Sequence, residues 1–204
     1  MPLFIDRLPL FRKTYRQGAE TFESWHPLLP MLVSEAEDEA PPPNALCRLW
    51  KYDTGNGLDA YAWKFHLLRC GFYPSNEDQL DPEKVRVIVA SGASADLRIR
   101  KACLWLVSNI PHLRQTPLRI PLYSGIPFAN AKYPDARGKT TAFPLIGIRA
   151  FHRAGLTIQI DMASLTLSIW APGSWLRGVG RFLRRLPDRF SRLSLDSLRE
   201  DDWA

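Results

Sequence analysis

Two segments in the middle of the chain place apolar residues at helical spacing. In residues 58–70 the apolar positions follow an i, i+3, i+4, i+7 pattern, and Gly71 follows as a stop signal. The same spacing recurs in residues 97–110, and Pro111 ends it. The pattern predicts two main helices, with core-facing residues Leu58, Tyr61, Ala62, Phe65 and Leu68 in the first and Ile99, Ala102, Cys103, Leu106 and Ile110 in the second.

Strand-like patterns surround these two segments. Residues 84–90 (KVRVIVA) form a short β-branched run. Residues 118–123 are expected to form an edge strand, because Pro117 before them and Pro121 within them remove backbone donors. Between 143 and 170, three apolar runs are separated by short turns, and the last two, 156–160 and 165–170, alternate with period two. This predicts a three-stranded antiparallel meander. The expected fold class is therefore α+β, with the meander and the 84–90 strand packed against the two main helices.

The segment after Pro172 and Gly173 is amphipathic. Ser174 provides an N-cap, and residues 175–186 carry an apolar stripe with arginines on the opposite side. Pro187 ends the pattern. We expect a basic amphipathic C-terminal helix over 175–186, and its outward arginines are Arg177, Arg181, Arg184 and Arg185.

The start of the chain mixes prolines with basic and aromatic residues, and it predicts at most one short helix over 10–25. Residues 34–44 join an acidic run to three successive prolines, a composition typical of a linker. We therefore expect four segments: an N-terminal arm over 1–33, this linker, an α+β core domain over 45–172 and a basic helical segment over 173–204.

Composition excludes several classes of protein. With 204 residues, 46% hydrophobic and 24% charged, the chain is not of the intrinsically disordered class. No apolar run reaches the roughly 18 residues that a membrane-spanning helix needs. Three widely separated cysteines do not fit a disulfide-rich secreted scaffold, so we expect a reducing, cytoplasmic location.

Positive charge is concentrated late in the chain, which has 27 Lys and Arg against 21 Asp and Glu, a net charge of +6. Arginine guanidinium groups match phosphate oxygens, and a tyrosine beside them can stack on a base. The sequence therefore favours a non-enzymatic basic accessory protein that binds nucleic acid, or a subunit of a nucleoprotein assembly. Besides the four helix arginines, the expected phosphate-contacting or base-stacking residues are Lys132, Tyr133, Arg137, Lys139 and Arg153.

Two other functions fit the same sequence. The first is a protein-interaction module that docks its C-terminal amphipathic helix in the groove of a partner. Peripheral membrane contact through this helix is less favoured, because Gly178 and Gly180 weaken it. The second is an enzyme of an unrecognised family, with a site near His66 and Cys70 or near His152.

Each candidate motif for a cofactor, a metal or catalysis lacks at least one feature that the corresponding known motif requires. The Gly138–Thr141 tetrapeptide resembles the end of a phosphate-binding loop, but Tyr133 stands where that loop needs its first glycine. His66 and Cys70 lie one helical turn apart, yet no CxxC pair supports a zinc site. No pair of acidic residues occupies matching strand positions, as a two-metal site would require. We therefore expect no cofactor, no metal and no catalytic residue from these motifs.

Overall fold

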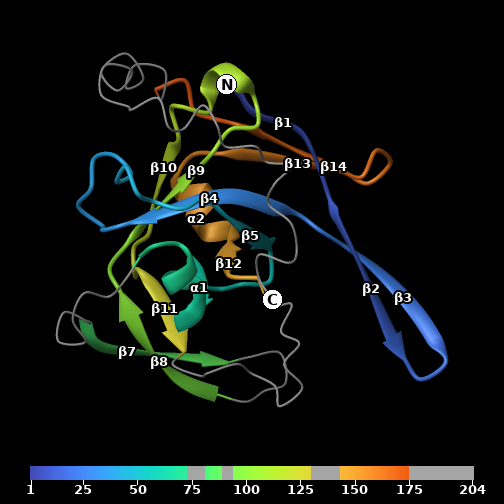
Figure 1. Cartoon of the computed structure of the whole chain (residues 1–204), viewed down its shortest axis with the longest axis horizontal. Coiled ribbons are helices and arrows are strands. Elements are labelled where there is room, and N and C mark those ends of the chain that lie inside the picture. Colours follow the sequence, from blue (N-terminus) through green and yellow to red (C-terminus); the bar gives the residue numbers. More distant parts are fainter. Residues whose placement is uncertain (73–80, 89–93, 130–142, 175–204) are drawn as a thin grey trace.

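The described part of the protein consists mostly of β-strands (Figure 1). The computed structural model describes residues 1–72, 81–88, 94–129 and 143–174. These residues form fourteen strands, two short α-helices and one 3-10 turn. The strands and helices are β1 (Leu3–Pro9), β2 (Phe11–Gln17), β3 (Glu20–His26), β4 (Leu28–Ser34), β5 (Arg48–Asp53), β6 (Ala60–Trp63), α1 (Lys64–Arg69), β7 (Asp81–Ile88), β8 (Ser94–Arg100), β9 (Cys103–Leu106), the turn Pro111–Leu113, β10 (Leu118–Pro121), β11 (Ile126–Ala129), β12 (Leu145–Gly147), α2 (Ile148–Arg153), β13 (Thr157–Asp161) and β14 (Thr166–Trp170).

A nine-stranded mixed sheet dominates the molecule, in the order β10-β9-β4-β5-β12-β6-β11-β8-β7. Among the described strand pairs, only β5–β12 and β6–β11 are parallel. A three-stranded sheet (β1-β14-β13) and a two-stranded ribbon (β2-β3) complete the fold. The expected α+β class is therefore wrong, because the described residues include no long helix that could form a helical layer.

Neither predicted main helix forms over its full length. In the first, 58–70, the six-residue helix α1 follows the strand β6, so the prediction is correct only for its second half. The second, 97–110, is replaced by parts of β8 and β9. Residues 97–99 alternate between buried and exposed, and all four residues of β9 are buried because its alternate side chains pack into two different apolar clusters. A short apolar run is compatible with both the helical period of 3.6 residues and the strand period of two. Here pairing with strands that are distant in the sequence stabilises the strand.

The predicted meander is only half correct. The runs at 156–160 and 165–170 form the hairpin β13–β14, and β14 buries alternate residues as its pattern predicts. The first run does not join them, because β12 ends at Gly147 and the chain continues as α2. The third strand of that sheet is β1, from the other end of the chain.

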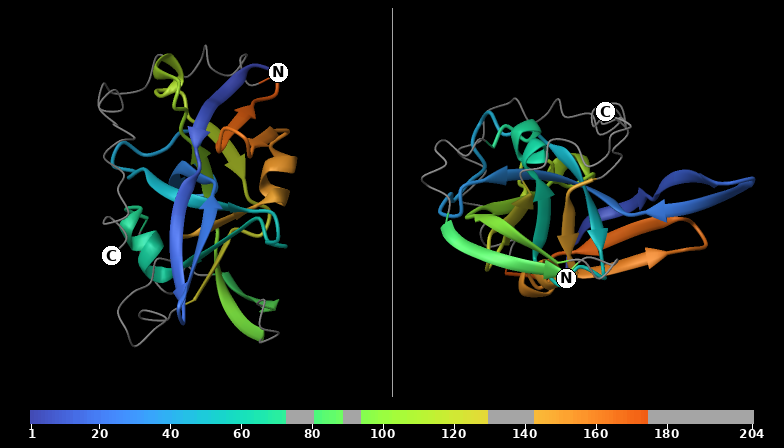
Figure 2. Two further views of the ribbon diagram at one scale, coloured as in Figure 1. Left: turned by 90° about the vertical axis from the view of Figure 1, so that its right-hand side faces the viewer. Right: turned by 90° about the horizontal axis from the view of Figure 1, so that it is seen from below.

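Two shorter predictions are confirmed, and a third is wrong. The 84–90 run lies largely in β7, and the 118–123 run contains β10, which is an edge strand of the large sheet. The helix predicted over 10–25 is instead the hairpin β2–β3, which projects from the rest of the molecule (Figure 2). The predicted C-terminal helix, 175–186, lies outside the described residues.

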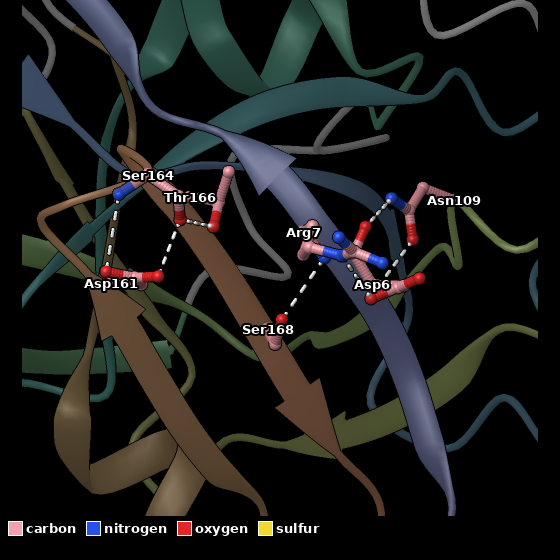
Figure 3. A network of polar contacts seen from close by, with 7 residues as sticks. All are labelled: Asp6, Arg7, Asn109, Asp161, Ser164, Thr166 and Ser168. Carbon is pink, nitrogen blue, oxygen red and sulfur yellow. Dashed lines mark hydrogen bonds and ion pairs between the residues drawn. The ribbon is translucent and has the colours of Figure 1, made fainter.

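Polar contacts help to attach β1 to its neighbours (Figure 3). The Asp6 N–H donates to Asn109 Oδ1 at 2.9 Å, and Asn109 Nδ2 donates back to the Asp6 carbonyl oxygen at 2.6 Å. The Arg7 N–H donates to Ser168 Oγ of β14 at 3.1 Å, at a point where the register of the β1–β14 pair shifts. The contact with Asn109 joins β1 to the middle of the chain, and the contact with Ser168 joins it to the other end of the described residues.

The first 34 residues also contribute to the main core. All seven residues of β4 are buried, and β4 pairs with β5 on one side and β9 on the other. Strands of the expected arm thus pair with strands of the expected core, while the division into four segments stays a prediction. Among the described helices, none is long and apolar enough to cross a membrane.

Candidate functional site

The most distinctive feature of the large sheet is the insertion of β12 between β5 and β6. These two strands are consecutive in the chain, yet each pairs with β12 rather than with the other, β5 in parallel and β6 antiparallel. The connection between them, residues 54–59, must therefore cross over the end of β12. We call this connection the crossover loop. It lies where the carboxyl ends of two parallel strands meet, the edge at which polar side chains in such sheets converge on ligands.

Gly147 is the residue over which the crossover loop passes. A Cβ atom here would lie 2.1 Å from the Leu58 carbonyl oxygen and 2.9 Å from that of Asn56. The Gly147 N–H also donates to the Asp59 carbonyl oxygen at 2.9 Å. Only glycine allows the loop to lie this close to the end of β12, so the sheet fixes the position of the loop.

Asp53 is the last residue of β5 and pairs with Gly147 in the register of the two parallel strands. Its side chain is half-buried, and the Gly55 N–H donates to its Oδ1 at 3.0 Å. Among the described residues, the other carboxylate oxygen has no hydrogen-bond partner. The neighbouring residues Thr54 and Gly55 are exposed. The Asp53 carboxylate is therefore fixed by one hydrogen bond at the surface of the turn, and its second oxygen can accept a hydrogen bond from a ligand or from water.

The rest of the loop is closed by hydrogen bonds of its own and by α2. The Asn56 N–H donates to the Asp53 carbonyl oxygen at 3.3 Å, and Asn56 Oδ1 accepts from the Leu58 N–H at 3.1 Å. Arg149 Nη1, from the first turn of α2, donates to the Gly57 carbonyl oxygen at 2.9 Å. The loop is therefore held from both sides, which reduces the freedom of the Asp53 carboxylate.

Asp59 anchors the far end of the loop. Its side chain is only 2% exposed, and its Oδ2 accepts from the Tyr123 N–H at 2.8 Å and from Arg153 Nη1. The Tyr123 ring lies 5.2 Å from the same guanidinium carbon. A buried carboxylate is stable only when paired, so Arg153 and Asp59 act as a unit that ties α2 to the start of β6.

The structure describes only one of the expected phosphate-contacting residues. Arg153 lies on α2, and its guanidinium group is already paired with Asp59. The other eight, Lys132, Tyr133, Arg137, Lys139, Arg177, Arg181, Arg184 and Arg185, lie outside the described residues.

His66 and Cys70, the residues of the alternative enzyme site, are fully buried on or beside α1. His66 Nδ1 accepts from the Trp63 N–H at 3.1 Å, which orients the imidazole toward the start of the helix. Burial raises the pKa of the Cys70 thiol to about 12, and it raises that of Cys47 equally. A thiol held in its neutral form is a poor nucleophile. His152, the other alternative, is exposed on α2.

No protein-family model and no curated protein sequence matches the chain. Within the described residues, no group of three or more His, Cys, Asp or Glu side chains could hold a metal ion. The function must therefore be argued from the site itself.

Sequence reasoning missed Asp53. The available signal was an aspartate followed by Thr54 and Gly55 at the end of an alternating apolar segment, Leu49 to Tyr52. Such a pattern places a carboxylate at a strand end, but it does not reveal that a strand from residues 145–147 passes beside it. That juxtaposition is visible only in the fold.

Proposed function

We propose that the protein is a hydrolase that cleaves peptide bonds with paired aspartates, one from each of two copies of the chain. The observation that supports this is the Asp53 carboxylate, which is held by one backbone N–H and open to solvent at its other oxygen. Two carboxylates that share one proton provide both a general base and a general acid.

A second copy is the natural source of the second carboxylate. Two described aspartates flank this loop, and Asp59 is buried and paired, so the half-buried Asp53 is the one with a carboxylate oxygen that has no described partner. In a two-fold dimer, a residue near the rotation axis lies next to the same residue of the second copy. Placing the turn at Asp53 on the axis would therefore bring two identical carboxylates together.

The proposed reaction proceeds as follows. The ionised Asp53 removes a proton from a water molecule, whose oxygen forms a bond to the carbonyl carbon of the substrate. The protonated Asp53 of the second copy donates its proton as the carbon–nitrogen bond breaks. The products are a carboxylic acid and an amine, and the pair returns to sharing a single proton. The rigid loop keeps both carboxylates in place through both proton transfers.

The direct test is Asp53→Asn, assayed on an unfolded protein substrate such as reduced casein with mass spectrometry of the products. We expect a loss of at least about 100-fold in rate, the usual contribution of one general acid or base. Asp161→Asn is the matched control, because Asp161 is likewise the last residue of a strand and accepts from the N–H groups of Ala163 and Ser164 in the turn that follows. The control variant should keep full activity.

Mixing experiments test whether the carboxylates act as a pair. When wild-type protein and Asp53→Asn are refolded together in equal amounts, roughly a quarter of the dimers retain both carboxylates if assembly is random. Activity per wild-type chain should therefore fall by about half. Unchanged activity per wild-type chain would show that a single carboxylate suffices, and wild-type protein without cleavage activity would overturn the proposal.

Nucleic-acid binding through the late arginines is a second proposal, and it is supported by the sequence alone. Its test is retention on polynucleotide at increasing salt, where phosphate contacts lower the logarithm of affinity by about 0.9 per contact for each tenfold increase in salt. Arg181→Ala with Arg184→Ala should weaken retention while thermal stability stays nearly unchanged. Equal retention by this double variant would remove the proposal.

A further inference from the structure

The exposed side of α2 borders a pocket of about 350 Å3, lined by Ile148, Arg149, His152 and Arg153. The opposite side of the helix is buried, with Ala150 and Phe151 in the main core. The four lining residues are therefore fixed by a helix that cannot rotate. A pocket of this size can hold a small organic molecule rather than a single ion.

Both guanidinium groups at this pocket are oriented by contacts outside it. Arg149 Nη1 donates to the Gly57 carbonyl oxygen, and Arg153 Nη1 donates to Asp59 Oδ2. Each contact uses one of the five N–H groups of a guanidinium, so most donors of both side chains remain available. Because the two arginines are one helical turn apart, their remaining donors face the same space.

The charge of the cluster is unbalanced. Asp59 neutralises Arg153, whereas the partner of Arg149 among the described residues is an uncharged carbonyl oxygen, so the two arginines and the aspartate together carry one net positive charge. His152 adds a ring N–H and lies one turn from the exposed Ile148. An anion between the two guanidinium groups would relieve their mutual repulsion.

We infer that this pocket, which we call the α2 pocket, binds a small phosphate monoester. A carboxylate has two oxygens, which one guanidinium fork satisfies, whereas the three terminal oxygens of a phosphate can accept from two forks at once. Ile148, 46% exposed, provides an apolar surface for the organic part of the ligand. This inference does not depend on the proposed peptide hydrolysis.

Calorimetric titration of the full-length protein with phenyl phosphate tests the inference, with inorganic phosphate and benzoate titrated in parallel. We expect phenyl phosphate to bind at least about tenfold more tightly than benzoate, because a second charged fork contributes only to the phosphate. It should also bind more tightly than inorganic phosphate, because the ring covers Ile148. Equal binding of benzoate, or no binding of phenyl phosphate, would overturn the inference.

Variants locate the binding. Arg149→Gln keeps an N–H donor for the Gly57 carbonyl oxygen but loses the charge, and it should weaken phenyl phosphate binding about tenfold. Ile148→Glu adds a negative charge without touching the crossover loop, so it provides the same test if the first variant is unstable. Arg98→Ala is the matched control, because it removes an exposed arginine on β8. Unchanged binding by both pocket variants, or equal weakening by the control, would overturn the inference.

Discussion

Replacing Gly147 by alanine tests whether the contact between the end of β12 and the crossover loop fixes Asp53. The added Cβ would overlap two backbone carbonyl oxygens, those of Leu58 and Asn56, at 2.1 and 2.9 Å. Neither oxygen can move by a change of rotamer, so the loop itself must shift. Gly147 has a φ of −89°, which any residue adopts, so the expected cost is steric and not conformational.

The magnitude follows from two contributions. Overpacking a rigid site costs about 1–3 kcal/mol, and the shift also breaks the hydrogen bond from the Gly147 N–H to the Asp59 carbonyl oxygen, which contributes about 1 kcal/mol. We expect a loss of about 3 kcal/mol in the free energy of unfolding, or a fall of roughly 6–12 °C in Tm for a chain of this size. Because the same loop holds Asp53, peptide hydrolysis should fall as well.

Urea denaturation followed by tryptophan fluorescence measures the effect. Gly57→Ala is the matched control, since it lies in the same loop and its Cβ would meet no atom within 4 Å. The control should change the free energy of unfolding by less than about 0.5 kcal/mol, as exposed substitutions usually do. If both variants have the same stability, the loop does not lie against Gly147 in solution, and the argument for a fixed carboxylate fails.

Two further predictions concern buried groups away from the crossover loop. The side chain of Arg100 is 4% exposed, and its Nη2 lies 2.5 Å from Glu35 Oε1. Glu35→Ala leaves this buried charge without its partner, so we expect the free energy of unfolding, measured by urea denaturation, to fall by about 2 kcal/mol. Glu37→Ala, at an exposed position nearby, is the control and should leave it almost unchanged. Burial raises the pKa of both Cys47 and Cys70 from 9.0 to about 12, so the unfolded chain loses these protons first as pH rises. The contribution of the two thiols to the free energy of unfolding is therefore fully present below pH 9. Between pH 9 and 12 it should fall by roughly 1 kcal/mol per thiol per pH unit. The variant with both cysteines replaced by alanine should show a smaller decline over that range, and an identical decline would contradict the assignment.

Local patterns predicted those strands whose partners lie nearby in the sequence. The alternation in residues 156–160 and 165–170 identified the hairpin β13–β14, because the pair is closed by a short turn and one face is buried. The 118–123 run was recognised as an edge strand because proline at such a position removes no needed donor.

The same reasoning failed where distant segments decide the structure. Residues 97–106 read equally well as one amphipathic helix or as two strands, and the pairing of β9 with β4, some seventy positions earlier, selects the strands. The candidate site depends on distant pairing in the same way. Asp53 and Gly147 are neighbours only because β12 enters between β5 and β6, and no local pattern around either residue encodes that event.

The insertion of β12 also sets an order of events during synthesis of the chain. Strands β5 and β6 leave the ribosome well before residues 145–147, and until then the centre of the large sheet has two open edges. Such edges recruit other strands, and contacts this distant in sequence form slowly. During this stage the open edges of β5 and β6 could pair with the wrong strands. The crossover loop and the Asp53 carboxylate reach their final positions only after β12 has been inserted.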